Sequence, residues 1–189
     1  MKKMTLIFIS LLGLLLSPLA YAHFHYELPL KTSLKVNDKK ELTGLDIVWV
    51  YDDELTGLML KDQKNVSKLG VKLMKDLNAL GYFTFLKING KAVNTSKVTS
   101  YKLEEMKKTD YSNLKLSFYL PLKKPVSLAG KNTLTFRHED ANASAVLYYD
   151  KPEHLQLGKE LQAHCKVVIT DKKDFEEGEA PQNVEVACE

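Results

Sequence analysis

Hydrophobic and polar residues alternate along much of the chain, and this period of two predicts half-buried β-strands. Between Phe24 and Val36 the apolar side chains occupy even positions and the polar ones mostly odd positions. The same alternation over residues 114–122 predicts a second strand with one buried face. Pro29 falls in the polar register of the first stretch and indicates an edge strand, because proline cannot donate to a β-ladder.

Shorter apolar stretches, bounded by turn signals, complete a set of eight or nine strands. Asn37-Asp38 indicates a turn before a return strand that carries a possible bulge at Gly44. Asn89-Gly90 is the strongest hairpin signal in the chain. The further strands are expected at residues 41–51, 82–88, 98–103, 133–138 and 145–149, while 170–183 is expected to be a surface loop.

Two helices are expected near the start of the chain. Asp52 or Asp53 is placed to cap a short helix that ends near Leu60. Apolar residues then recur at helical spacing from about Val66, and Gly81 ends that helix. The expected fold is therefore α+β, a mainly antiparallel curled sheet or sandwich with two helices inserted early in the chain.

The first 22 residues have the pattern of a signal peptide. Lys2 and Lys3 precede an apolar run, and Ala20-Tyr21-Ala22 is a small-x-small cleavage site. Residues 1–22 are expected to be removed, and residues 23–189 to form one periplasmic domain with no stable membrane insertion after cleavage.

Composition narrows the functional classes. The 189 residues carry a net charge of +3, which removal of Lys2 and Lys3 lowers to +1, so nothing favours a nucleic-acid partner. Gly-x-Ser-x-Gly, phosphate-loop and His-Glu-x-x-His motifs do not occur, and we expect no enzymatic activity.

Cys165 and Cys188 are expected to form a disulfide, since an even number of cysteines in an exported chain indicates pairing. If the two flanking strands are antiparallel, pairing these cysteines also places Val167 opposite Val186 and Ile169 opposite Val184. Ligation of a metal by the thiols is the alternative, but no Cys-x-x-Cys spacing supports it.

Cleavage after Ala22 would expose a cluster of nitrogen donors. The new α-amine, the amides of Phe24 and His25 and the His25 ring can surround one ion in the square plane that Cu(II) and Ni(II) prefer. In a rival geometry the amine and ring of His23 clamp a copper ion, and His25 or a distant histidine completes a T-shaped site. An extended strand would instead present His23, His25 and Glu27 as a row on one face. The planar chelate and the extended row exclude each other at His25, and incidental histidines on a frayed terminus are a further possibility.

A second group of potential ligands is His138, Glu139 and Asp140, at the end of an expected strand. These residues join a metal site only if the N-terminal strand lies beside them. His154 and His164 are expected to be solvated. The carboxylates of residues 52–54 are explained by a helix start, where the helix dipole stabilises them.

Several segments resemble a bacterial family of exported proteins of unknown function, which is described as the periplasmic component of an uncharacterised ABC-type transport system. The matching segments are Ala22-His23-Phe24-His25, Trp49-Val50-Tyr51-Asp52-Asp53-Glu54, Gly81-Tyr82-Phe83-Thr84 and Pro121-Leu122-Lys123-Lys124-Pro125. Phe24 replaces the family's usual proline, and the family's later Tyr-Asp-Pro-x-Tyr-Tyr element is altered.

The resemblance implies a periplasmic protein whose relatives often accompany nickel, cobalt or zinc transporters. We therefore expect an accessory protein that binds a divalent transition metal ion (nickel, copper, zinc or cobalt) and serves a membrane metal transporter. The alternatives are an envelope scaffold or protein-interaction module with no metal role, and a copper oxidase that uses a terminal-histidine clamp.

Overall fold

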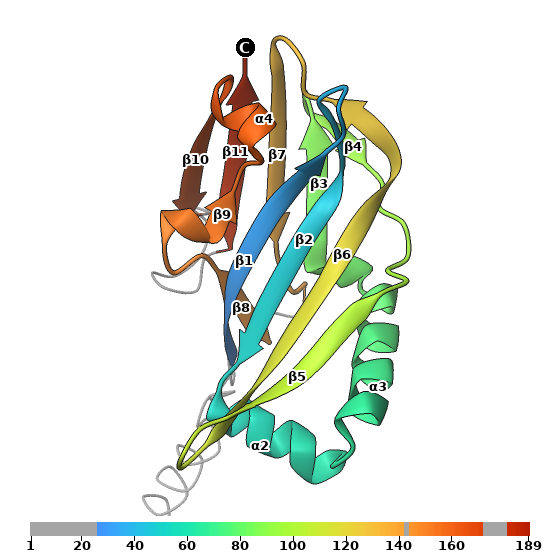
Figure 1. Cartoon of the computed structure of the whole chain (residues 1–189), viewed down its shortest axis with the longest axis vertical. Coiled ribbons are helices and arrows are strands. Elements are labelled where there is room, and N and C mark those ends of the chain that lie inside the picture. The colour runs from blue at the N-terminus through green and yellow to red at the C-terminus, as the bar shows by residue number, and fades with distance from the viewer. Residues whose placement is uncertain (1–25, 142–143, 172–180) are drawn as a thin grey trace, which may run out of the picture.

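Two β-sheets face each other in a sandwich, with helices at one end and along one edge (Figure 1). The computed structural model describes residues 26–141, 144–171 and 181–189. The expected signal peptide, His23 and His25 lie outside the described residues. No helix among the described residues is long and apolar enough to cross a membrane.

The first sheet has six strands in the order β5-β6-β2-β1-β8, with β9 also paired to β1. The long strands are antiparallel to one another, whereas β8 and β9 run parallel to β1. Their bounds are Tyr26–Val36 (β1), Glu41–Tyr51 (β2), Tyr101–Lys107 (β5), Ser112–Ser127 (β6), Ala145–Tyr148 (β8) and Leu155–Gln156 (β9).

The second sheet has five strands, all antiparallel, in the order β10-β11-β7-β3-β4. The Asn89-Gly90 turn joins β3 to β4 as the sequence predicts, with Ile88 opposite Lys91. The bounds are Thr84–Ile88 (β3), Lys91–Val93 (β4), Asn132–His138 (β7), Cys165–Asp171 (β10) and Gln182–Cys188 (β11).

The two early helices form where the sequence predicts them. Asp52 caps α2, accepting a hydrogen bond from the amide of Leu55 at 2.8 Å, and Asn65 caps α3 in the same way. The helical elements are α2 (Asp53–Asp62), α3 (Val66–Ala79), α4 (Lys159–Gln162), and the 3-10 turns η2 (Gly81–Phe83) and η3 (Pro152–His154).

Apolar residues from both sheets and from α3 form the core, as the alternation requires. Trp49 is 1% exposed, stacks on Phe83 and meets Phe118 edge-to-face. Leu30, Leu45 and Ile47 of the first sheet and Leu134 and Val184 of the second are fully buried.

The disulfide and its register are confirmed. Cys165 and Cys188 are bonded, and they are direct partners in the β10–β11 ladder. Val167 lies opposite Val186 and Ile169 opposite Val184, so the sequence pattern predicts this register residue by residue.

The edge-strand prediction for the first strand is wrong. β1 lies inside its sheet, with β2 on one side and the short strands β8 and β9 on the other. The β8 ladder runs from Tyr26 to Pro29, and the β2 ladder begins at Leu30. Pro29 is tolerated because it stands where β1 exchanges one partner for the other. The suspected bulge is confirmed, since the β2–β6 register shifts between Leu42 and Gly44.

Candidate functional site

The start of β1 lies against the acidic turn that follows β7. The Tyr26 amide donates a hydrogen bond to the Ser144 carbonyl at 3.0 Å, and Tyr26 is the parallel partner of Ala145. The Ser144 amide in turn donates to Asp140 Oδ2 at 3.2 Å. Two hydrogen bonds therefore connect the first described residue of the chain to an acidic side chain of the predicted metal site.

Glu27 is exposed on β1 and lies beside β8. Burial raises the pKa of the Tyr148 phenol, and the carboxylates of Glu27 and Asp150 raise it further. Glu27 thus adds negative charge to the same end of β1 that the acidic turn approaches.

Glu139 is held by its neighbours on the second sheet. Its carboxylate forms an ion pair with Arg137, and its amide donates to the Phe83 carbonyl at 2.8 Å. Glu139 therefore fixes the turn, whereas Asp140 accepts a hydrogen bond from the Ser144 amide beside the start of β1.

His138 is turned into the core, where it is 2% exposed. Its Nδ1 lies 3.0 Å from Thr84 Oγ1, and its Nε2 lies 3.5 Å from Thr32 Oγ1. Tyr149 Oη donates to Thr32 Oγ1 at 2.8 Å. Ligation of an ion by His138 would require one of the two threonine hydroxyls to be displaced, so we assign the ring a structural role.

Thr84, His138, Thr32 and Tyr149 form a buried hydrogen-bond chain, and the groups at its two ends determine the direction of each hydrogen bond. Thr84 Oγ1 donates to the Tyr82 carbonyl at 2.8 Å, so it accepts from His138 Nδ1–H. Thr32 accepts from Tyr149, so its own proton is directed at Nε2. The chain links both sheets and places the proton of the neutral imidazole on Nδ1.

Burial lowers the pKa of His138 from 6.5 to about 4, because the charged ring would lose its hydration in the core. Burial also raises the pKa of Tyr149, and the hydrogen bond from Tyr149 to Thr32 offsets part of that rise. Both groups are therefore neutral near pH 7, as an uncharged hydrogen-bonded chain requires.

Next to the buried hydrogen-bond chain, three successive residues have left-handed backbone conformations. Gly81, Tyr82 and Phe83 have φ angles of 61°, 56° and 52°. Left-handed geometry costs about 1–2 kcal/mol per non-glycine residue. Packing offsets that cost, since the Tyr82 ring lies against Phe118 and the Phe83 ring stacks on Trp49. The turn holds Glu139 and His138 through the contacts described above.

The described residues contain no group of three or more His, Cys, Asp or Glu side chains close enough to share an ion. His154 is half-buried in η3, next to β9, which pairs with Thr32. Thr32 is six residues along β1 from Tyr26, roughly 20 Å in an extended strand. His164 is exposed beside the disulfide, as predicted. His154 and His164 thus lie away from this end of β1, and His138 is turned into the core.

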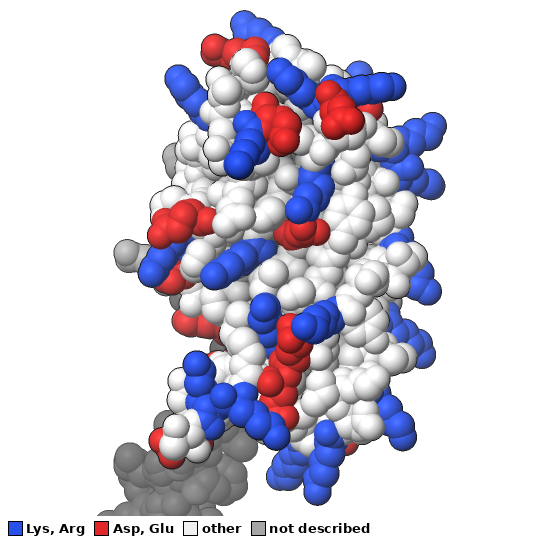
Figure 2. All heavy atoms as spheres, in the orientation of Figure 1, with Lys and Arg blue, Asp and Glu red and all other residues white. Residues whose placement is uncertain are grey.

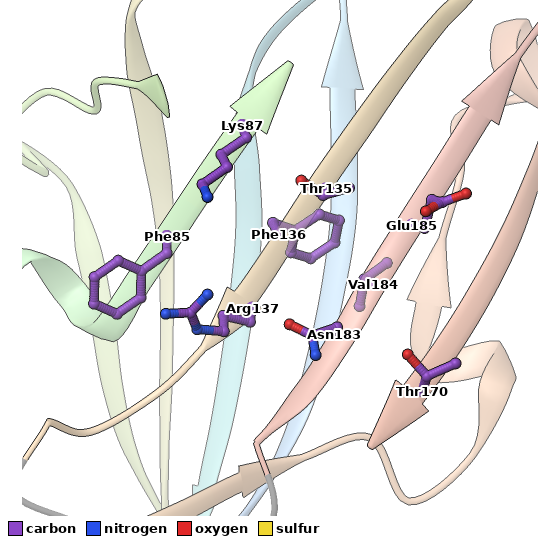
Figure 3. Close-up of a pocket in the computed structure, with 9 residues that line it drawn as sticks. All are labelled: Phe85, Lys87, Thr135, Phe136, Arg137, Thr170, Asn183, Val184 and Glu185. Atoms are coloured by element: carbon purple, nitrogen blue, oxygen red, sulfur yellow. The ribbon is translucent and has the colours of Figure 1, made fainter. Parts of the chain in front are cut away.

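A shallow groove, which the sequence did not predict, crosses the outer face of the second sheet (Figure 3). It has a volume of about 270 Å³ and spans β3, β7, β11 and the end of β10. The Arg137 guanidinium lies 4.8 Å from the centre of the Phe85 ring, which is 46% exposed. Lys87 and Glu185 place opposite charges along the groove.

No curated protein matches the chain. Residues 8–185 match the family described as "Protein of unknown function (DUF1007)". This match covers both sheets and the turn beside the start of β1, so the chain belongs to that family.

Proposed function

We propose that this protein is a periplasmic accessory protein that binds a divalent transition metal ion and serves a membrane metal transport system. The ion is bound at the processed N-terminus by His23 and His25, with Glu27 and Asp140 as the neighbouring carboxylates. The observation that carries the proposal is the pair of hydrogen bonds that joins Tyr26 to Ser144 and Ser144 to Asp140.

Covalent reach supports this arrangement. Consecutive Cα atoms are about 3.8 Å apart, so the Cα of His23 lies within roughly 11 Å of the Tyr26 Cα. The acidic turn is bound to Tyr26 itself. Imidazoles that precede Tyr26 and carboxylates that follow β7 are therefore available to one ion. The disulfide supports an oxidising compartment.

The two geometries open at the terminus require different donors. A planar chelate uses the α-amine, two amide nitrogens and His25, and it favours copper or nickel. An extended row uses the His23 and His25 rings with Glu27 or Asp140, a mixed nitrogen and oxygen set that also suits zinc and cobalt. The carboxylates matter only in the second geometry.

Isothermal titration of the processed protein with nickel, copper, zinc and cobalt tests the proposal, after N-terminal sequencing has established that His23 is the first residue. Replacing His23 and His25 with Ala should weaken binding by more than the roughly 10–100-fold that loss of an outer-shell partner costs. His164→Ala, exposed beside the disulfide, is the matched control and should bind normally. A silent titration with all four ions would refute the proposal.

One added residue separates the two geometries. A glycine placed before His23 moves His25 out of the third position and abolishes the planar chelate, whereas the extended row keeps both rings. Asp140→Asn should weaken binding in the row geometry and leave the chelate unchanged. The absorption spectrum with Cu(II) or Ni(II) reports the same distinction.

A second candidate function is an envelope interaction module, and the groove of Figure 3 favours it. An exposed aromatic ring with a stacked cation is typical of protein-binding surfaces. Affinity capture from periplasmic extracts with Phe85→Ala as the comparison tests this function. Unchanged metal tolerance in a strain that lacks His23 and His25, together with a Phe85-dependent partner, would favour it over metal binding.

A further inference from the structure

The outward side of α3 carries a row of lysines. Lys68, Lys72 and Lys75 are all exposed and share one helix face through their spacing of three and four residues. Val71 lies on the same side and is 62% exposed. The opposite face is apolar and packs into the core through Leu69, Gly70, Met74 and Leu77.

Hydrogen bonds extend this basic surface beyond the helix. Tyr82 Oη donates to Asn78 Oδ1 of α3 at 3.0 Å and accepts from the Val98 amide at 2.9 Å. The exposed Lys97 precedes Val98, so it lies beside the C-terminal half of α3.

The same loop is joined to β6. The Ser96 amide donates to the Pro121 carbonyl, and the Lys123 amide donates to the Asn94 carbonyl, both at 2.8 Å. The resulting surface, here called the lysine strip, consists of Lys68, Lys72, Lys75, Lys97, Lys123 and Lys124. Basic side chains follow the α3 edge of the molecule in Figure 2.

Acidic residues neutralise little of the strip. Asp62 pairs with Lys72 at 2.8 Å, but both side chains are more than half exposed, so the pair is weak and screened by solvent. Residues 61–79 contain five lysines and two aspartates, Asp62 and Asp76, and both aspartates interact with Lys72. The strip therefore presents a net positive charge.

We propose that the lysine strip docks the protein on an anionic phospholipid bilayer. Lysine ammonium groups are compact point charges that suit the many phosphate groups of a lipid surface. Recognition of one ligand of defined shape more often uses the bidentate guanidinium group of arginine. The charges are spread along α3, about 21 Å long, and onto β6, an extended surface rather than a pocket. The exposed Val71 among them can enter the headgroup region.

This inference is independent of metal binding, although the two are compatible. β2 ends level with the first residues of β1, because Trp49 pairs with Leu30, and α2 begins directly after β2. The helices and the start of β1 therefore share one end of the molecule (Figure 1). α3 packs against β5, at the opposite edge of the first sheet from β8, so docking through α3 does not cover the proposed ion site beside β8.

Co-sedimentation of the full processed protein with vesicles tests the inference. The protein should bind vesicles of phosphatidylglycerol mixed with phosphatidylcholine and should not bind vesicles of pure phosphatidylcholine. High salt should release the bound protein, because it screens the charges. Each lysine near an anionic surface contributes roughly a fivefold gain in affinity, so replacing Lys68, Lys72 and Lys75 with Gln should weaken binding roughly 100-fold.

The matched control replaces three exposed lysines of the opposite edge, Lys151, Lys159 and Lys166, with Gln. This variant loses the same charge and should bind nearly as the wild type does. Equal loss in the two variants would overturn the inference, because it would reflect net charge alone. Binding that ignores salt, or a wild type that does not distinguish the two vesicle types, would overturn it as well. The metal titration of the strip variant should remain unchanged, which keeps this test separate from that of the proposed function.

Discussion

The buried hydrogen-bond chain through His138 makes the stability of this protein depend on pH. The unfolded imidazole has a pKa near 6.5, and the folded one about 4. Between these values the unfolded state binds the proton more strongly than the folded state does. The contribution of His138 is therefore fully present above pH 6.5 and is lost as pH falls through the folded pKa.

The size of the effect follows from the same two values. The full difference corresponds to about 3 kcal/mol, of which about 2 kcal/mol is lost between pH 7 and pH 5. The groups around the ring are the hydroxyls of Thr84, Thr32 and Tyr149 and the ring of Phe136, so no described contact of the ring with a carboxylate compensates for its charge.

Urea unfolding of the metal-free protein at pH 7 and pH 5, followed through the buried Trp49, measures this loss. His138→Gln cannot titrate, so its stability should fall by about 2 kcal/mol less over the same interval than that of the wild type. His164→Gln removes an exposed imidazole and should retain the wild-type dependence. Equal pH dependence in the wild type and His138→Gln would refute the reasoning, whatever the absolute stability of the variant.

Three further changes test other parts of the fold, each by urea unfolding. Replacing Cys165 and Cys188 with Ser should lower the free energy of unfolding by about 3 kcal/mol, because the bond closes a loop with a sequence separation of 23; a midpoint unaffected by reducing agent would contradict this. Tyr82→Phe removes the acceptor of the buried Val98 amide and should cost about 1–3 kcal/mol, and a neutral result would mean that water replaces the hydroxyl. Asp52→Ala removes the α2 cap and should cost about 1 kcal/mol, with loss of helical circular dichroism; an unchanged midpoint would show that α2 does not unfold with the sheets.

Local pattern was sufficient to predict most strands, both early helices and the cysteine register. The period of two fixes which side chains share a face, and the covalent bond between Cys165 and Cys188 then sets the register of the whole β10–β11 ladder. The order of strands within the sheets was beyond this reasoning, because period and propensity do not say which strands are neighbours. The parallel pairing of β1 with β8 was missed for that reason.

The burial of His138 was also missed, although the sequence contains its signal. His138 continues the even-numbered series of Leu134 and Phe136, which faces the core. Thr32 falls in the apolar register of β1, and Tyr149 follows Leu147 at a spacing of two. Polar residues in phase with an apolar series indicate a buried polar network. The predicted metal site instead groups His138 with the two acidic residues that follow it, as potential ligands. The terminal histidines remain a prediction, since they lie outside the described residues.

The position of β11 has a consequence for how the protein is made. This strand is synthesised after every other strand described here, yet it stands between β7 and β10 and pairs with both. Because the chain is synthesised from its N-terminus, β7 exists before β11, and the edge of β7 that pairs with β11 stays unpaired until residues 182–188 are made. The arrival of β11 then pairs this edge, brings Cys188 to Cys165 and completes the sheet.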